Sequence, residues 1–237
     1  MKEAISAEQI TIDQMAQMID HTFLKAYAKK EDLKKLCEEA KANHFKMVAI
    51  NSVPVAYCHK QLKGSNVHVG AAISFPFGQT TIESKAFETK NAIENGADEI
   101  DYVLNIGQLK DKNLDYIRRE METIVKLCHS HKVIVKVILE TCYLTDLDII
   151  NACQIAREIK PDFVKTSTGF GSAGAKVEDV RLMKKTVGSL VKVKAAGGIR
   201  SLTDALAMIK AGAERIGTSH GIEIINELKR GQKHGQV

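Results

Sequence analysis

The chain has 237 residues and a formal net charge of +5 at pH 7, carried by lysines and arginines dispersed along its length. A charge this mild, with no aromatic residues interleaved among the lysines, argues against nucleic acid as a partner, although it suits a small anionic substrate. No stretch approaches the roughly 20 apolar residues of a membrane span, so we expect no membrane association.

The cysteines and the N-terminal sequence bear on location. The five cysteines form no CxxC pair, and their odd number on expected helices and strand ends predicts free thiols in a reducing compartment. The first 20 residues lack the apolar region of a signal peptide and contain acidic residues that a transit peptide would not. We therefore expect a cytoplasmic protein.

Short apolar runs alternate with helical patterns along the whole chain. A short helix is expected near residues 6–17. Eight strands are then expected at 18–22, 46–50, 67–75, 98–104, 133–139, 162–165, 191–195 and 214–218. Between them lie amphipathic segments such as 29–44, with apolar residues at helical spacing, and 201–213, which opens on a Ser cap and ends on Gly212.

This alternation predicts the fold. Strands that alternate with helices form right-handed crossovers and a parallel sheet, and eight such units favour closure into a (β/α)₈ TIM barrel preceded by a short N-terminal helix. Pattern alone also permits an open, doubly wound sheet, but neither GxGxxG after the first strand nor GxxxxGK[ST] is present. We expect residues 1–237 to form a single barrel domain.

Several expected strands contain charged residues, which is unusual because strands of a parallel barrel are buried on both faces. Side-chain alternation directs seven of these residues into the barrel. They are Glu99, Asp101, Lys136, Glu140, Lys165, Lys192 and Lys194. Since burying unpaired charges is costly, we interpret Glu99, Lys136 and Lys192 as structural ion pairs or as side chains that reach solvent at strand ends.

Asp101, Lys165 and Lys194 differ because each lies at the C-terminal end of its strand, where barrel active sites form. The strands that carry the two lysines are neighbours, so their ammonium groups should approach and lower the pKa of one of them. An amine that is free near pH 7 can attack an aldehyde, and Asp101 could relay the protons, directly or through water. The pattern indicates aldol chemistry without a metal or a cofactor, although lysines at strand ends also bind phosphate.

Glycine-rich segments follow the last three strands, at 165–174, 194–200 and 216–221. Loops after strands seven and eight commonly form the phosphate site of a barrel. Backbone N–H groups at helix starts donate to an anion, and glycine allows it to come close. We therefore expect a small phosphorylated substrate.

Five long segments stand out in sequence order. They are IDHTFLK (19–25), GADEIDYVLNIG (96–107), VKVILET (135–141), DFVKTSTGFG (162–171) and VKAAGGIRS (193–201). Together they resemble the motifs of the deoxyribose-phosphate aldolases, and the resemblance covers nearly the whole chain. It implies a class I aldolase that cleaves 2-deoxy-D-ribose 5-phosphate to acetaldehyde and D-glyceraldehyde 3-phosphate.

The resemblance also implies roles for individual residues. Lys165 would form the Schiff base, Lys194 would lower its pKa, and Asp101 would relay protons. Residues implied near the substrate are Asp20, Thr22 and Thr168, and those implied around the phosphate are Gly169, Gly197, Gly198 and Ser219. The chain departs from the family pattern at Tyr102, where Met is usual, and at His220, where a second Ser often stands.

Alternative functions remain at this point. A related Schiff-base aldolase with another acceptor would keep both lysines, and a non-catalytic phosphosugar-binding barrel would keep only the glycine loops. His129 and His131 form an HxH pair, which we interpret as a solvated turn because no third ligand is evident. Barrels often dimerise through their outer helices, so a homodimer is the assembly that we consider.

Overall fold

Eight parallel strands close into a barrel in which each strand pairs with the next and β8 pairs with β1. The structure is a computed structural model that describes residues 10–233. The strands are β1 (Ile19–Thr22), β2 (Met47–Asn51), β3 (His68–Ile73), β4 (Glu99–Val103), β5 (Ile134–Ile138), β6 (Phe163–Lys165), β7 (Lys192–Ala196) and β8 (Arg215–Thr218). All eight predicted strands, their order and the closed barrel are confirmed.

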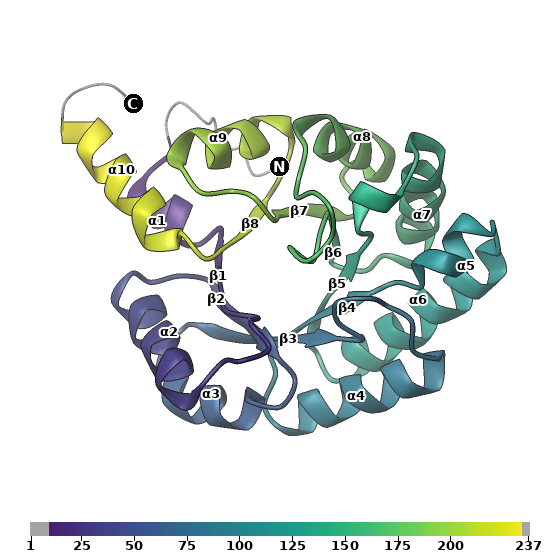
Figure 1. The fold of residues 1–237 in the computed structure, drawn as a ribbon, viewed down its shortest axis with the longest axis horizontal. Helices are drawn as coiled ribbons and strands as arrows, with labels where there is room; N and C mark the ends of the chain where they lie inside the picture. The colour runs from purple at the N-terminus through teal and green to yellow at the C-terminus, as the bar shows by residue number, and fades with distance from the viewer. Residues whose placement is uncertain (1–9, 234–237) are drawn as a thin grey trace.

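Helices surround the ring of strands (Figure 1). They are α1 (Ile12–Ala16), α2 (Lys30–Ala42), α3 (Val55–Leu62), α4 (Ile82–Glu94), α5 (Ile106–Lys110), α6 (Leu114–Ser130), α7 (Asp146–Ile159), α8 (Val177–Val187), α9 (Leu202–Ala211) and α10 (Gly221–Lys233). The predicted leading helix is α1, capped by Thr11. Residues 6–9 of that prediction lie outside the described residues.

The connection between β4 and β5 contains two helices, α5 and α6, where a single helix was expected. Lys112 has a φ of 58°, which is incompatible with a continuing helix. Asn113 then caps α6, its side chain accepting from the N–H of Tyr116. The chain therefore turns at this point before it runs back beside the barrel.

Side-chain alternation separates an apolar outer face of the barrel from a charged interior. Val135 and Val137 of β5 belong to the core between strands and helices, whereas Lys136 between them is fully buried on the other face. Gly217 provides room inside, because a Cβ there would lie 3.2 Å from Cε of Lys194. Small residues at inward positions thus accommodate long charged side chains.

Two of the seven charges predicted inside the barrel are not part of its interior. Lys192, the first residue of β7, is exposed, and its amine lies 5.4 Å from the ring centroid of Phe163. Glu140 follows the end of β5 with a φ of 56° and bonds to Thr168. Alternation fails for Glu140 because the strand has already ended, and Lys192 reaches solvent because it stands at the opening of the barrel.

Residues 10–233 contain no helix with both the length and the apolar character needed to cross a membrane. The five cysteines all lie in this range as free thiols.

A buried ion pair connects two outer helices to the end of β4. Lys85 of α4 and Glu120 of α6 are fully buried and their charged atoms lie 2.6 Å apart. Lys85 also donates to the carbonyl oxygen of Val103 at 2.7 Å, and Glu120 accepts from the N–H of Asn105 at 3.0 Å. The pair therefore holds the backbone just beyond Asp101.

We predict that Glu120→Leu lowers the free energy of unfolding by about 3–5 kcal/mol, since it leaves the Lys85 ammonium buried without its partner. The double variant Lys85→Met/Glu120→Leu should recover part of that loss, because both charges are removed. Urea denaturation measures both effects. As a control, the exposed Lys90–Glu94 pair on α4 can be broken by Glu94→Ala, which should cost about 0.5 kcal/mol or less. A double variant no more stable than the single one would contradict this account.

Candidate active site

Three predicted residues, Asp101, Lys165 and Lys194, meet inside the barrel. Oδ2 of Asp101 accepts from Nζ of Lys165 at 2.8 Å and from Nζ of Lys194 at 2.7 Å. Its Oδ1 accepts from Nζ of Lys136 at 2.7 Å. Strand register produces this meeting, because Lys165 pairs with Lys194 between β6 and β7, and Asp101 pairs with Lys136 between β4 and β5. One carboxylate therefore holds three amines.

The charges shift the titration of these groups. Burial by itself would raise the pKa of Asp101, but attraction to Lys136, Lys165 and Lys194 outweighs it and holds that pKa well below the ordinary range. For Lys165, burial is the largest effect and lowers the pKa to about 8; Asp101 opposes this change, and repulsion by Lys194 adds to it. Lys165 is thus partly a free amine near neutral pH, and burial contributes more to this than its neighbouring lysine.

Asp20 lies within β1 and faces the interior charges, not the substrate space implied by the family resemblance. Its Oδ2 is 2.5 Å from Nζ of Lys194, and its Oδ1 accepts from Nε of Arg215 at 2.7 Å. Arg215, buried at the start of β8, was missed by the sequence analysis. The alternation used for the other strands could have found it, since Arg215 and the inward Gly217 share one face.

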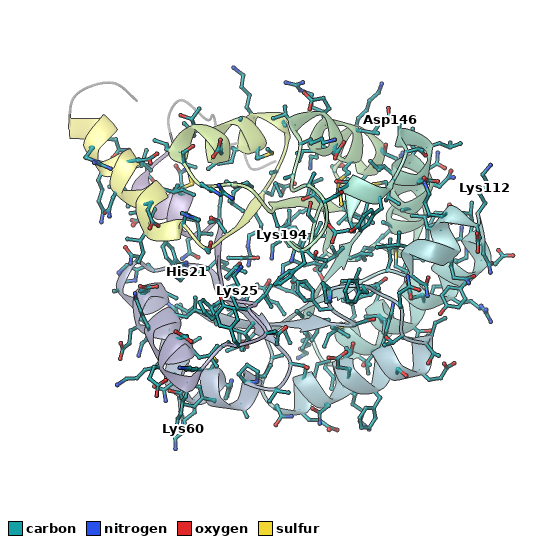
Figure 2. The ribbon with its side chains drawn as sticks, viewed as in Figure 1. His21, Lys25, Lys60, Lys112, Asp146 and Lys194 are labelled. Carbon is teal, nitrogen blue, oxygen red and sulfur yellow. The ribbon has the colours of Figure 1, made fainter. Side chains whose placement is uncertain are left out.

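A pocket of about 510 Å³ opens at the C-terminal end of the barrel. Lys165 is part of its wall, while Asp101 and Lys194 are buried behind that wall. Figure 2 shows Lys194 within the ring of strands and Lys60 and Lys112 at the outer edge of the molecule. The other wall residues predicted from the sequence are Thr22, Thr168, Gly169, Gly197, Gly198 and Ser219.

The loop after β7 gives the pocket a backbone surface. Gly197 and Gly198 have φ values of 85° and 78°, a region that side-chain-bearing residues rarely adopt. The wall residues that were not predicted include Lys25, Arg200 and His220. Lys25 and Arg200 bring positive charge to the pocket. Its Ser219–His220 side adjoins the N-terminus of α10, so an anion fits at that side.

Thr168 is held in place by Glu140. The Glu140 carboxylate accepts from the backbone N–H of Thr168 at 3.1 Å and also from its hydroxyl. The Thr168 hydroxyl oxygen in turn accepts from the N–H of Phe170 at 3.0 Å. Burial raises the pKa of Glu140, against the opposing effect of its bonds to Thr168. The loop after Lys165 is therefore anchored from β5.

Within residues 10–233, no three His, Cys, Asp or Glu side chains are grouped so that they could hold a metal ion. Of the HxH pair, His129 lies 3.1 Å from Asp162 and is exposed at the end of α6. His131 ends that helix, and its Nδ1 lies 3.0 Å from the carbonyl oxygen of Leu127.

Comparison with known proteins agrees with the resemblance to the deoxyribose-phosphate aldolases. The sequence model of a family described as DeoC/LacD family aldolase matches residues 11–227. A deoxyribose-phosphate aldolase of Lactobacillus acidophilus is 60% identical over 96% of each chain. One of Bacteroides thetaiotaomicron is 55% identical over 94% of each chain. Among solved structures, the tetrameric deoxyribose phosphate aldolase of Aeropyrum pernix is 32% identical with a TM-score of 0.86, covering 92% of each chain.

We predict that the reactivity of Lys165 toward a small carbonyl reagent rises with pH and is half-maximal at about pH 8, because only the unprotonated amine attacks. Reductive methylation by formaldehyde and cyanoborohydride from pH 6 to 10, read by peptide mass spectrometry, measures this midpoint. Exposed lysines of ordinary pKa, about 10.4, should continue to gain reactivity above pH 9. A midpoint for Lys165 close to theirs would contradict the prediction.

Proposed function

Since the chain belongs to the DeoC/LacD family of aldolases, we propose that it reversibly cleaves 2-deoxy-D-ribose 5-phosphate to acetaldehyde and D-glyceraldehyde 3-phosphate. One observation carries the chemistry: Lys165, an amine with a pKa of about 8, is part of the wall of a pocket lined by glycines. The names of the relatives, deoxyribose-phosphate aldolase, support the substrate.

The reaction begins at the aldehyde carbon of the open-chain sugar. The unprotonated Nζ of Lys165 adds to C1, giving a carbinolamine that loses water and becomes an iminium ion. The iminium withdraws electrons from C2, so the C2–C3 bond can break once the C3 hydroxyl gives up its proton. D-glyceraldehyde 3-phosphate leaves, and the electron pair of the broken bond forms an enamine on Lys165.

The enamine then takes a proton at C2, and water hydrolyses the resulting iminium to release acetaldehyde and the free amine. Asp101 is the proton relay that we propose for these steps, because Oδ2 contacts the amines of both Lys165 and Lys194. Its depressed pKa keeps it ionised. A proton that leaves Lys165 can therefore be shared along Asp101 and Lys194, close to the reacting atoms.

The phosphate would bind at the opposite end of the pocket from Lys165. We assign it to the backbone of Gly169, Gly197 and Gly198, with Ser219 two residues before α10. Thr22 and Thr168 lie between this end and Lys165 on our assignment, where their hydroxyls can reach the sugar hydroxyls. Asp20 then acts on Lys194 and not on the substrate.

We also propose that the whole chain, residues 1–237, is one domain that works in the cytoplasm, which the free thiols favour. A homodimer is our expectation for its assembly. The relative from Aeropyrum pernix is described as a tetramer, so light scattering coupled to size exclusion would decide between the two.

We predict that borohydride added with acetaldehyde traps a stable ethyl adduct on Lys165, identified by peptide mass mapping. The variant Lys165→Met should lose the adduct and at least 1,000-fold in cleavage rate, since no other amine of the pocket wall contacts Asp101. Lys60→Met on the outer surface of α3 is the matched control and should behave like the unchanged protein. An adduct at another lysine, or none, would sink the assignment.

We predict that Arg200→Ala lowers kcat/KM for 2-deoxyribose 5-phosphate by about tenfold, because one charge-assisted contact to the phosphate is lost. The value for unphosphorylated 2-deoxyribose should hardly change. Arg157→Ala on the exposed side of α7 serves as the control for a general charge effect. Equal losses for both substrates would argue against a phosphate at this end of the pocket.

A further inference from the structure

Six charged side chains inside the barrel form a closed ring in which cations and anions alternate. In order around the ring they are Arg215, Asp20, Lys194, Asp101, Lys136 and Glu99. All six are buried. The ring closes where an Arg215 nitrogen lies 3.2 Å from Oε2 of Glu99, so β1, β4, β5, β7 and β8 each contribute to it.

The ring is neutral by itself, because three cations face three anions. Lys165 is the one further charged side chain in ion-pair contact with the described members of this ring inside the barrel, and it has no carboxylate of its own, since its only ion-pair partner among the described residues is Oδ2 of Asp101. That oxygen is already shared with Lys194 at 2.7 Å. If every group were charged, the interior would carry one excess positive charge.

The contacts identify the amine that carries this excess. Lys194 contacts two carboxylates, Asp20 and Asp101, and Lys136 contacts Glu99 and Asp101. Removing a proton from either lysine would break the alternation of charges, because two carboxylates would each lose a cationic partner. Removing it from Lys165 leaves the ring intact and makes the interior neutral, which is the arrangement that costs least in a medium of low dielectric constant.

We propose that Arg215 and Glu99, neither of which lines the pocket, are positioning residues whose charges make Lys165 the amine that gives up its proton. This inference rests on the proposed role of Lys165 as the nucleophile. Arg215 contributes through Asp20, and Glu99 through Lys136. Neither residue needs to touch the substrate for its charge to determine when the reaction can begin.

Few other titratable groups adjoin this arrangement. Glu140 approaches Lys165 from the end of β5 and attracts it, but makes no ion pair with it; its carboxylate accepts from Thr168, and it is the same in all the variants compared below. His68 at the start of β3 lies 2.7 Å from Glu99 Oε1, and Lys46 lies 3.2 Å from the other ring nitrogen of His68. These two residues stand at the N-terminal opening of the barrel, separated from Lys165 by the ring itself.

Two substitutions of similar shape test the proposal because their effects should have opposite signs. Arg215→Met gives the ring a charge of −1, so Lys165 should hold its proton more firmly. Glu99→Gln gives the ring a charge of +1, so Lys165 should lose its proton more easily. We expect the midpoint of Lys165 imine formation to rise by about one pH unit in the first variant and to fall by about one in the second.

The measurement is the initial rate at which the borohydride-trapped acetaldehyde adduct forms on Lys165 between pH 5 and 10. It is read together with the pH profile of kcat/KM. The double variant Arg215→Met/Glu99→Gln restores a neutral ring and should return the midpoint to that of the unchanged protein. Arg215→Lys keeps the charge and should shift it little. Lys60→Met, far outside the barrel, should not shift it at all.

Opposite shifts that cancel in the double variant support the proposal. Loss of packing alone would shift both midpoints in the same direction or leave both unchanged. Shifts of the same sign, or unchanged midpoints with the adduct still on Lys165, would overturn it. If Arg215→Met does not fold, Glu99→Gln decides alone, and a midpoint that does not fall overturns the proposal. An unchanged protein that forms no adduct at Lys165 would instead refute the proposed function.

Discussion

The carboxylate of Asp101 accepts from three lysine amines at once, and the interior of the barrel depends on this arrangement. Lys136, Lys165 and Lys194 come from three successive strands, β5, β6 and β7, and would repel one another without it. Removing ions from water costs several kcal/mol each unless they are well paired. The barrel meets this cost by closing the charges into an alternating ring, in which Asp20, Glu99 and Asp101 each face two or more cations.

Strand geometry makes such an interior possible. Outward residues such as Val135, Val137 and Ile216 form the apolar core with the helices, so the stability of the barrel does not require an apolar interior. Inward glycines at positions such as Gly217 leave space for lysine side chains. Phe163 lies within 6.0 Å of Lys136, Lys192 and Arg215. The interior is thus packed and charged, while the pocket begins only above Lys165.

On this proposal, substrate binding and proton transfer involve two different regions of the barrel: the pocket wall and the buried charges behind it. The pocket wall includes glycines of the loops after β6 and β7, which suits an anion, and the groups that we propose share protons, Asp101 and Lys194, lie buried behind it. Lys165 belongs to both regions, since it is part of the wall and also contacts Asp101. A neutral amine at this boundary can attack a carbonyl, and a small number of buried charges determines its protonation.

The sequence by itself determined the eight strands and their order, because alternating apolar runs and helical patterns permit few topologies. It predicted the end of the barrel at which the candidate site's pocket opens. It also predicted the meeting of Lys165 and Lys194, since neighbouring parallel strands bring their C-terminal ends together. Alternation gives each side chain a direction but neither its depth along the barrel axis nor the point where a strand ends. For that reason Lys192 reaches solvent, Glu140 anchors Thr168, and Asp20 faces Arg215 instead of the pocket. The closed ring of charges was decided only by the tertiary structure, because it joins β1 to β8 across 195 residues of sequence and β4 to β8 across 116.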